Sequence, residues 1–147
     1  MSNIQLTKNF TLKEFTRSST ATQMDIDNDP RLSVVYNLRT LCETVLQPIR
    51  NLWGSPIFIT SGYRSAELNK AVGGATNSDH MYGTAADLRP IPYSPERCRQ
   101  LFDIIKQMIN TNQITVKQLI DEKNYSWIHI SFQDGRTSKF NQVLHLK

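Results

Sequence analysis

The order of helix and strand signals restricts the fold of this chain more than any other feature. Short segments that are rich in β-branched residues or that alternate apolar and polar side chains predict strands at 57–60, 84–88, 116–121, 127–132 and 140–146. Helix signals begin at Thr11, Asp29–Pro30, Ser65 and Ser94–Pro95, so helices and strands do not alternate as repeated βαβ units. We therefore predict an α+β fold in which helices pack on a small, mostly antiparallel sheet.

The longest helical pattern begins at Asp29–Pro30 and ends at Gly54. Asp accepts hydrogen bonds from a first helical turn, Pro is tolerated at the first helical position, and Gly commonly ends a helix. Apolar residues recur along this pattern at helical spacing, and they predict a core-facing stripe of Leu38, Leu41, Cys42, Val45, Leu46, Ile49 and Leu52. Because Pro48 has no amide hydrogen, we expect the helix to kink there.

Length and composition indicate one ordinary globular domain that spans residues 1–147. Of the 147 residues, 39% are hydrophobic and 20% are charged, and no linker or repeat divides the chain. Cys42 and Cys98 lie inside helical patterns without a Cys or His neighbour, so we expect two reduced core thiols. A core of this size needs no disulfide, structural metal or second subunit, so we expect a monomer in which any metal serves catalysis.

Charge and hydropathy restrict the partners of the chain. Lys and Arg together number 17 and Asp and Glu 13, and the resulting net charge of +4 favours anionic polymers such as cell walls or nucleic acid. The sequence has no stripe of interleaved aromatic and basic residues, so we expect no nucleic-acid binding. It also has neither about 18 consecutive apolar residues nor the pattern of a secretory signal, so we expect no membrane contact and no export signal.

Two predicted strands present polar side chains on the face away from the core. In 127–132 the isoleucines and the phenylalanine share the core face, so His129 lies on the opposite face. In 84–88 the same alternation places Asp87 away from the core, beside Ala85, whose small side chain leaves room for the carboxylate. Each strand therefore offers one side chain that could bind a metal or take part in catalysis.

A second histidine, His80, lies seven residues before Asp87. The intervening Gly83 suits a loop that folds back over a strand end better than a continuous helix. Two imidazoles and one carboxylate match the three protein ligands of a catalytic zinc ion, which keeps a fourth position for water and lowers the pKa of that water. Spacing alone leaves two alternatives open, a hydrogen-bonded structural His129 and a turn-forming Asp87.

The segment 78–87 carries the strongest motif of the chain. Its sequence SDHMYGTAAD resembles the SxHxxGxAxD signature of the zinc D-alanyl-D-alanine carboxypeptidase family, which also contains phage endolysins, and all five fixed positions agree. Segments similar to the compact single-domain branch of that family lie at 10–15, 46–50, 60–65, 71–74, 118–120 and 127–132. The resemblance implies the small α+β fold shared with the Hedgehog signalling domain.

The same resemblance implies roles for individual residues. His80, Asp87 and His129 correspond to the zinc ligands of the family. Arg64 follows a Ser-Gly-Tyr turn, where the family has an arginine near the substrate, and its guanidinium suits a peptide carboxylate or an oxyanion. Further residues expected to support the ligand loop or to line the substrate cleft are Ser78, Tyr63 and Trp127.

At the position of the general base, this sequence differs from the better-known members of the family that it resembles. Several of them carry an acidic residue three positions before the second histidine ligand, where this chain has Ser126. The compact branch instead carries a pattern similar to QLIxE. Residues 118–122 match this pattern, and the resemblance therefore nominates Glu122 as the general base. Alternation puts Glu122 and Asp121 on opposite faces of the strand without indicating which face is that of the site. Asp121 is therefore the alternative base, and two charged residues that open a loop are a third interpretation.

These features predict a zinc metallopeptidase that hydrolyses an amide bond in the stem peptides of peptidoglycan. The predicted cofactor is Zn²⁺, and the enzyme would be either a D-Ala-D-Ala carboxypeptidase or an endolysin-type endopeptidase of bacterial or phage origin. Because Ser126 replaces an acid, the alternative is a non-catalytic zinc-containing module that binds the cell wall or a protein. We expect synthesis in the cytoplasm of a bacterial or phage-infected cell and action at the cell wall or in the periplasm.

Overall fold

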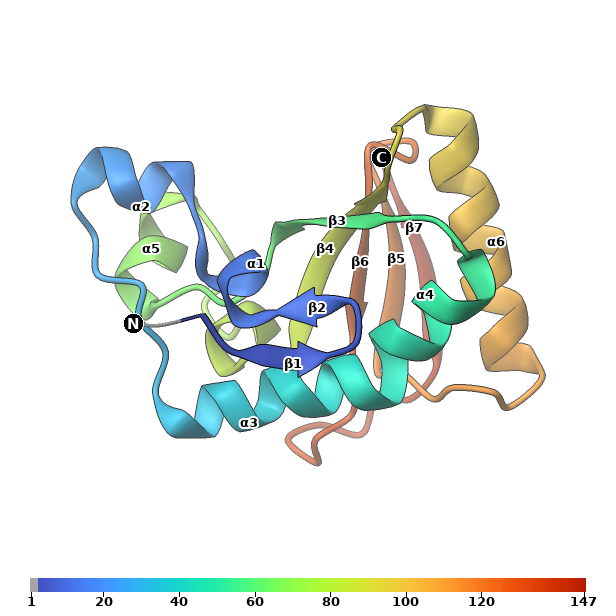
Figure 1. Cartoon of the computed structure of the whole chain (residues 1–147), viewed down its shortest axis with the longest axis horizontal. Coiled ribbons are helices and arrows are strands. Elements are labelled where there is room, and N and C mark those ends of the chain that lie inside the picture. Colours follow the sequence, from blue (N-terminus) through green and yellow to red (C-terminus); the bar gives the residue numbers. More distant parts are fainter. Residues whose placement is uncertain (1–2) are drawn as a thin grey trace.

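A five-stranded sheet forms the centre of the protein, and the computed structural model describes residues 3–147 (Figure 1). The strands of this sheet are β3 (Ile57–Ser61), β4 (Ala85–Pro90), β5 (Gln118–Glu122), β6 (Trp127–Ser131) and β7 (Gln142–Leu146). Their order in space is β3-β4-β6-β5-β7. Neighbouring strands are antiparallel except β5 and β7, which run parallel. The predicted α+β fold with a mostly antiparallel sheet is confirmed.

Helices and a short ribbon surround the sheet. The helices are α1 (Leu12–Thr16), α2 (Ser19–Met24), α3 (Leu32–Leu41), α4 (Gln47–Trp53), α5 (Ala66–Ala71) and α6 (Pro95–Asn110). The remaining elements are a π-helical turn η1 (Cys42–Leu46), a 3-10 turn η2 (Asp79–Tyr82) and an antiparallel ribbon of β1 (Gln5–Thr7) and β2 (Phe10–Thr11). In Figure 1, α2 and α5 lie together at one end of the molecule and α6 lies at the other.

One face of the sheet builds the main hydrophobic core. It supplies Leu88, Leu119, Ile128 and Ile130, which pack against apolar side chains of α1, α3, α4 and α6. This is the face that the alternation of 84–88 and 127–132 predicts. Since the core occupies one face, the side chains at alternate positions of β4, β5 and β6 are left for the opposite face. No helix within residues 3–147 combines the length and the apolar character that crossing a bilayer requires.

Capping side chains begin several helices where the sequence predicts them. The Glu14 carboxylate accepts a hydrogen bond from the backbone N–H of Thr11 at 2.6 Å, which completes the expected capping box of α1. Ser65 and Ser94 each accept a hydrogen bond from a backbone N–H of the first turn, of α5 and α6 respectively. Gly54 ends α4 with a φ of 77°, which glycine adopts without steric cost.

Two details of the longest predicted helix are wrong, namely its first residue and the burial of Leu52. It begins at Leu32, after an extended Arg31, rather than at Asp29–Pro30. The turn η1 comes shortly before Pro48, and the N–H of Gln47 donates to the carbonyl of Cys42, five residues back; the kink at Pro48 stays a prediction. This turn inserts an extra residue and rotates the following face by about 100°. Leu52, predicted in the core, is therefore 56% exposed.

The two cysteines are free and buried, as the sequence predicts. Burial raises the pKa of both thiols, and that of Cys98 reaches about 11. Neither sulfur therefore forms a reactive thiolate at neutral pH.

Candidate metal centre

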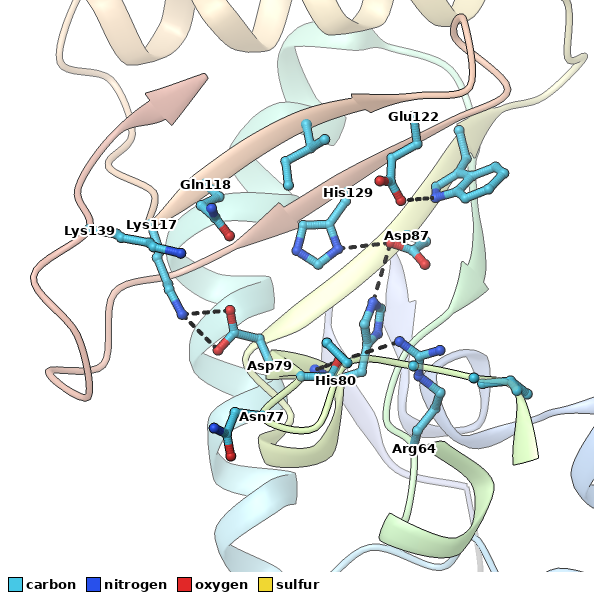
Figure 2. A pocket seen from close by; sticks show the side chains of 17 residues that line it. Arg64, Asn77, Asp79, His80, Asp87, Lys117, Gln118, Glu122, His129 and Lys139 are labelled. Carbon is cyan, nitrogen blue, oxygen red and sulfur yellow. Dashed lines mark hydrogen bonds and ion pairs between the residues drawn. The ribbon is translucent and has the colours of Figure 1, made fainter. Parts of the chain in front are cut away.

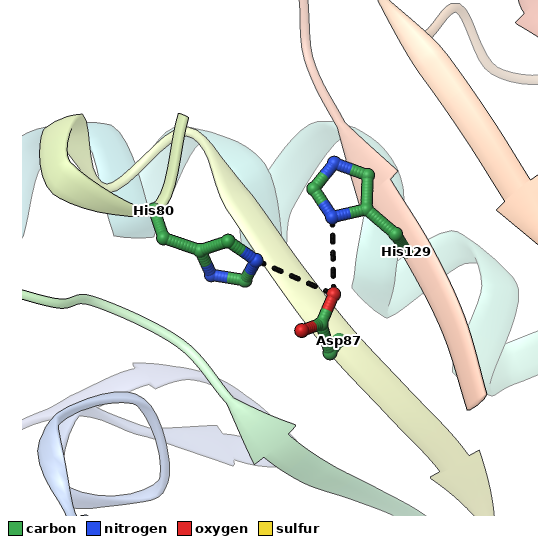
Figure 3. Close-up of side chains that lie close together, drawn as sticks. All are labelled: His80, Asp87 and His129. Atoms are coloured by element: carbon green, nitrogen blue, oxygen red, sulfur yellow. Dashed lines mark hydrogen bonds and ion pairs between the residues drawn. The ribbon is translucent and has the colours of Figure 1, made fainter. Parts of the chain in front are cut away.

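Three potential metal ligands from distant parts of the chain meet on the face of the sheet opposite the core (Figure 3). His80 lies on η2, Asp87 on β4 and His129 on β6. Asp87 and His129 are directly opposite each other in the register of the two antiparallel strands. One ligand atom from each of the three residues lies within 4.8 Å of the other two. The structure thus brings together the three residues that the motif nominates.

The turn that carries His80 is held by short-range contacts. The hydroxyl of Ser78 accepts a hydrogen bond from the His80 N–H at 3.2 Å and so begins the turn. Gly83 ends it with a φ of 75°, and a Cβ there would lie 2.8 Å from the carbonyl oxygen of Val34. The backbone N–H of Arg64 donates to the carbonyl of His80 at 3.0 Å. These contacts explain why the motif requires a small hydroxyl residue before the histidine and a glycine after it.

A backbone carbonyl fixes the ring of His80. Its Nδ1 lies 2.7 Å from the carbonyl oxygen of Gly62. Because a carbonyl oxygen only accepts hydrogen bonds, Nδ1 carries a proton, and Nε2 is left with a lone pair when the imidazole is neutral. Metal-binding histidines are commonly oriented by such a contact on the second ring nitrogen. Figure 3 shows Nε2 of His80 pointing at the carboxylate of Asp87.

The three ligand atoms lie close enough to share protons or a metal ion. Oδ1 of Asp87 lies 3.3 Å from Nε2 of His80 and 3.0 Å from Nδ1 of His129. A lone pair facing a carboxylate oxygen at this distance is repulsive unless a proton or a metal ion lies between the two atoms. Burial by itself raises the pKa of Asp87, but the charge of His80 and hydrogen bonds from both imidazoles outweigh it, so the pKa lies well below its ordinary value. Two imidazoles and an ionised carboxylate fit a zinc ion.

A cleft of about 510 Å³ opens over the three ligands (Figure 2). Residues expected to act on the substrate also line it, namely Arg64, Ser78, Glu122 and Trp127. Tyr63 is buried and does not line this cleft, but it lines a smaller neighbouring cavity. The cleft therefore collects a potential metal site, a carboxylate and an arginine in one place.

The structure distinguishes the two candidate bases by the face on which each lies. The carboxylate of Glu122 is in the cleft, where its Oε2 accepts a hydrogen bond from the indole N–H of Trp127 at 3.0 Å. Asp121 is buried on the opposite face, where it accepts the Tyr125 N–H at 2.6 Å and contacts Nδ1 of His145 at 3.1 Å. Of the two carboxylates, only that of Glu122 lines the cleft.

Ser126, the position at which the resemblance leads one to expect an acid, is also outside the cleft. Its hydroxyl donates to the carbonyl of Lys123 at 2.7 Å, within the loop that joins β5 to β6. Ser126 therefore stabilises the loop and supplies nothing to the cleft. Glu122 is the last residue of β5, directly before this loop, and its carboxylate lines the cleft.

Arg64 lies at the edge of the metal centre with unused hydrogen-bonding capacity. One terminal nitrogen donates to the Ser78 hydroxyl at 3.4 Å, whereas the buried Nε has no partner among residues 3–147. Burial lowers the pKa of Arg64, and the negative charge of Asp87 opposes that effect. An arginine with a buried, unpaired N–H beside a cleft is suited to bind an oxyanion or a carboxylate.

A buried ion-pair network behind His80 was not foreseen from the sequence. The carboxylate of Asp79 accepts hydrogen bonds from Nζ of Lys117 at 2.8 and 3.0 Å and from Arg136 at 2.6 Å. Burial raises the pKa of Asp79, but these two cations more than compensate and lower it below its ordinary value. The available signal was a lysine within the strand pattern 116–121, because a charge that such a strand buries needs a partner.

Comparison with known proteins identifies the family. A sequence profile described as Peptidase M15 matches residues 8–131, which include His80, Asp87, Glu122 and His129. The chain belongs to the peptidase M15 family. A zinc D-Ala-D-Ala carboxypeptidase of Streptomyces albus G is 54% identical over 44 residues. That match covers 29% of this chain and 17% of the relative, so the chain is compared with only a small part of the Streptomyces protein.

The family assignment confirms the relationship that the motif of residues 78–87 predicts. It also agrees with the α+β fold. The likeness to the Hedgehog signalling domain and the single-domain organisation of 1–147 stay predictions.

Proposed function

We propose that this protein is a zinc-dependent peptidase that hydrolyses an amide bond in the stem peptides of peptidoglycan. The observation that carries the proposal is the convergence of His80, Asp87 and His129 in a cleft that also holds the carboxylate of Glu122. Membership of the peptidase M15 family supports a peptidase, and the name of the Streptomyces relative supports zinc and a D-Ala-containing substrate.

His80, Asp87 and His129 would hold the zinc ion. When bound, zinc supplies Lewis-acid chemistry, which polarises a carbonyl and makes a water ligand more acidic. The protein prepares the ligands in advance, because Gly62 orients the ring of His80 and the strand register faces His129 towards Asp87. Little rearrangement of these residues is therefore needed to bind the ion.

Glu122 acts as the general base in this proposal. The indole N–H of Trp127 donates to Oε2 of Glu122 and holds the carboxylate in the cleft. Oε1 is then free to accept a proton from the attacking water and to pass it to the leaving amine. Glu122 and Trp127 are directly paired across β5 and β6, so the strand register sets the position of the base.

Arg64 binds negative charge on the substrate. Its unpaired Nε–H and second terminal nitrogen can donate to a peptide carboxylate or to the oxyanion that develops at the scissile carbonyl. The contact with Ser78 ties the guanidinium to the turn that carries His80. Trp127 contributes an aromatic wall to the same cleft.

The experiment is digestion of purified peptidoglycan by the purified protein with added zinc and with a chelator, followed by mass spectrometry of the products. We expect zinc-dependent cleavage of stem peptides. Because a general base contributes about 100-fold to 10,000-fold to the rate, Glu122→Gln should lower kcat by at least about 100-fold while zinc content stays unchanged. Asp121→Asn is the matched control, since that carboxylate faces away from the cleft. Cleavage that survives complete zinc removal would exclude the proposal.

The second candidate is a zinc-containing module that binds the cell wall or a protein without cleaving it. The observation that favours it is Ser126, whose hydroxyl is used inside its own loop and supplies no base. The same assay discriminates the two candidates. A wild type that sediments with peptidoglycan but releases neither D-Ala nor stem fragments would support the binding module.

We further propose that the enzyme is a monomer made in a bacterial or phage-infected cell and active at the cell wall or in the periplasm. The net charge of +4 supports attraction to anionic wall polymers. An endolysin role predicts lysis when the protein is added to cells with a permeabilised outer layer. Analytical ultracentrifugation tests the monomer.

A further inference from the structure

A second cavity adjoins the cleft beside the metal centre. It has a volume of about 260 Å³ and meets the main cleft at Arg64, Val72 and Asp87, which line both spaces. Its other walls come from the start of α2 and from the end of β3. The metal ligand Asp87 therefore borders both spaces, as does Arg64.

The second cavity is lined mainly by hydroxyl groups. Three of the residues that carry them lie at the start of α2 or directly before it, and two lie at the end of β3. They are Ser18, Ser19, Thr20, Thr60 and Ser61. Hydroxyls both donate and accept hydrogen bonds, so they suit the alternating N–H and C=O groups of a peptide. The lining contains little apolar surface apart from Leu68, Val72 and the ring of Tyr63, so a polar segment fits better than an apolar one.

A cation, Arg17, also lines this cavity. The guanidinium of Arg17 lies 4.6 Å from the ring centre of Phe58, and one terminal nitrogen is 3.5 Å from the carbonyl oxygen of Ile59. Arg17 forms no ion pair within residues 3–147. Its charge is therefore available to a carboxylate on a bound peptide.

The size of both spaces argues against a site that binds only the last residue of a chain. A volume of about 260 Å³ corresponds to roughly nine liquid waters at about 30 Å³ each. A terminal carboxylate displaces far fewer waters than this, and the main cleft on the other side is about twice as large. A carboxypeptidase needs room for an extended chain on only one side of the scissile bond.

We propose that the peptide crosses the metal centre and occupies both spaces, so that the enzyme cuts an internal amide bond. The second cavity then binds a polar, carboxylate-bearing segment of the peptide, with Arg17 as its anionic subsite. This inference rests on the proposed peptidase function and defines its substrate class as internal bonds rather than a terminal D-Ala.

The first experiment compares two substrates with the zinc-loaded wild type. One is purified peptidoglycan, with the new termini identified by mass spectrometry, and the other is a short acylated peptide that ends in D-Ala-D-Ala, with released D-Ala quantified. Internal cleavage at a rate at least about tenfold above D-Ala release supports the inference. Release of D-Ala as the main reaction overturns it and leaves the proposed peptidase intact. Hydrolysis of neither substrate removes the proposed function, and the inference with it.

The second experiment fills the cavity. Ser19→Trp places a large side chain in it, whereas Thr22→Trp changes the same helix at a position that does not line it. We expect kcat/KM for internal cleavage to fall at least about tenfold in Ser19→Trp and to change less than twofold in Thr22→Trp. A peptide shortened on the side of this cavity should be cleaved equally by both variants and the wild type, which also shows that Ser19→Trp is folded. Equal rates of the two variants on the long substrate would overturn the inference.

The third experiment tests the anionic subsite with two peptides that differ only in one group, a free carboxylate or its carboxamide, on the segment assigned to the cavity. Arg17→Gln should raise KM for the carboxylate form about tenfold, the effect of one charge-assisted hydrogen bond, and should leave the carboxamide form unchanged. An equal effect on both peptides would mean that Arg17 does not bind the carboxylate.

Discussion

Lys117→Met removes the buried cation that holds Asp79, the neighbour of His80. Lys117 lies just before β5, and its ammonium contacts both oxygens of Asp79, so it ties the sheet to the turn that carries the ligand. Methionine has a similar length and no charge. The substitution therefore tests the ion pair with little change in packing volume.

The expected cost follows from the partners that remain. Removing one member of a buried ion pair costs about 3–5 kcal/mol. In Lys117→Met the carboxylate of Asp79 keeps Arg136 at 2.6 Å, so the lower end, about 3 kcal/mol, applies. In Asp79→Asn the ammonium of Lys117 loses its only carboxylate partner within residues 3–147, so the upper end, about 5 kcal/mol, applies. The double variant contains neither member of the pair, and its cost should be at least about 1 kcal/mol below the sum of the two single costs.

The measurement is urea unfolding of the wild type, the two single variants and the double variant, with Tm as a second readout. A cost of about 3 kcal/mol corresponds to a Tm lower by about 6–12 °C for a protein of this size. Zinc affinity, measured by competition with a chromophoric chelator, should fall about tenfold in Lys117→Met, because the turn that carries His80 is less firmly held. Costs that add without coupling, or a Lys117→Met cost below about 1 kcal/mol, would refute the reasoning.

Three further predictions concern the ligands, the approach of two backbones and a buried thiol. His129→Ala should reduce bound zinc to near zero by metal analysis, whereas His145→Ala, which contacts Asp121 on the opposite face, should retain it. Gly62→Ala should lower the free energy of unfolding by about 1–3 kcal/mol in urea, because a Cβ there would lie 2.5 Å from backbone atoms of Phe15; an unchanged midpoint would contradict this. The pKa of Cys98 is raised from 9.0 to about 11, so stability should fall as pH rises from 9 to 11, and Cys98→Ala should show a shallower decline than the wild type.

Alternation along single strands carried much of the information about the site. The isoleucines of 127–132 identify the core face, and this is enough to place His129 on the other side. The same reasoning places Asp87. What alternation cannot supply is the register, since sliding one strand by two residues keeps every face and moves Asp87 away from His129. The pairing of these two residues therefore became visible only in the assembled sheet.

Some elements shorter than about two helical turns could not be predicted from the sequence, whereas the equally short α1 and α5 were predicted from their capping residues. The ribbon of β1 and β2 has three and two residues and the helix α2 has six, too few to develop a recognisable period. The turn η1 was missed for a different reason, because a single wide turn leaves the apolar pattern before it intact and changes only the phase after it. Leu52 was misplaced by that change of phase.

The hairpin between β5 and β6 shows why the choice between Asp121 and Glu122 as the general base needed the three-dimensional structure. Its residues Lys123, Asn124 and Tyr125 all have positive φ, which is sterically unfavourable for residues other than glycine. Asp121 compensates by accepting the N–H of Tyr125, so its carboxylate stabilises the loop from the buried face. Because alternation then turns Glu122 to the other face, the residue that holds the hairpin and the residue proposed as base are neighbours in sequence with separate tasks. Asp121→Asn should therefore lower the free energy of unfolding and leave the carboxylate of Glu122 in the cleft. Glu122→Gln should remove that carboxylate and leave the free energy of unfolding unchanged.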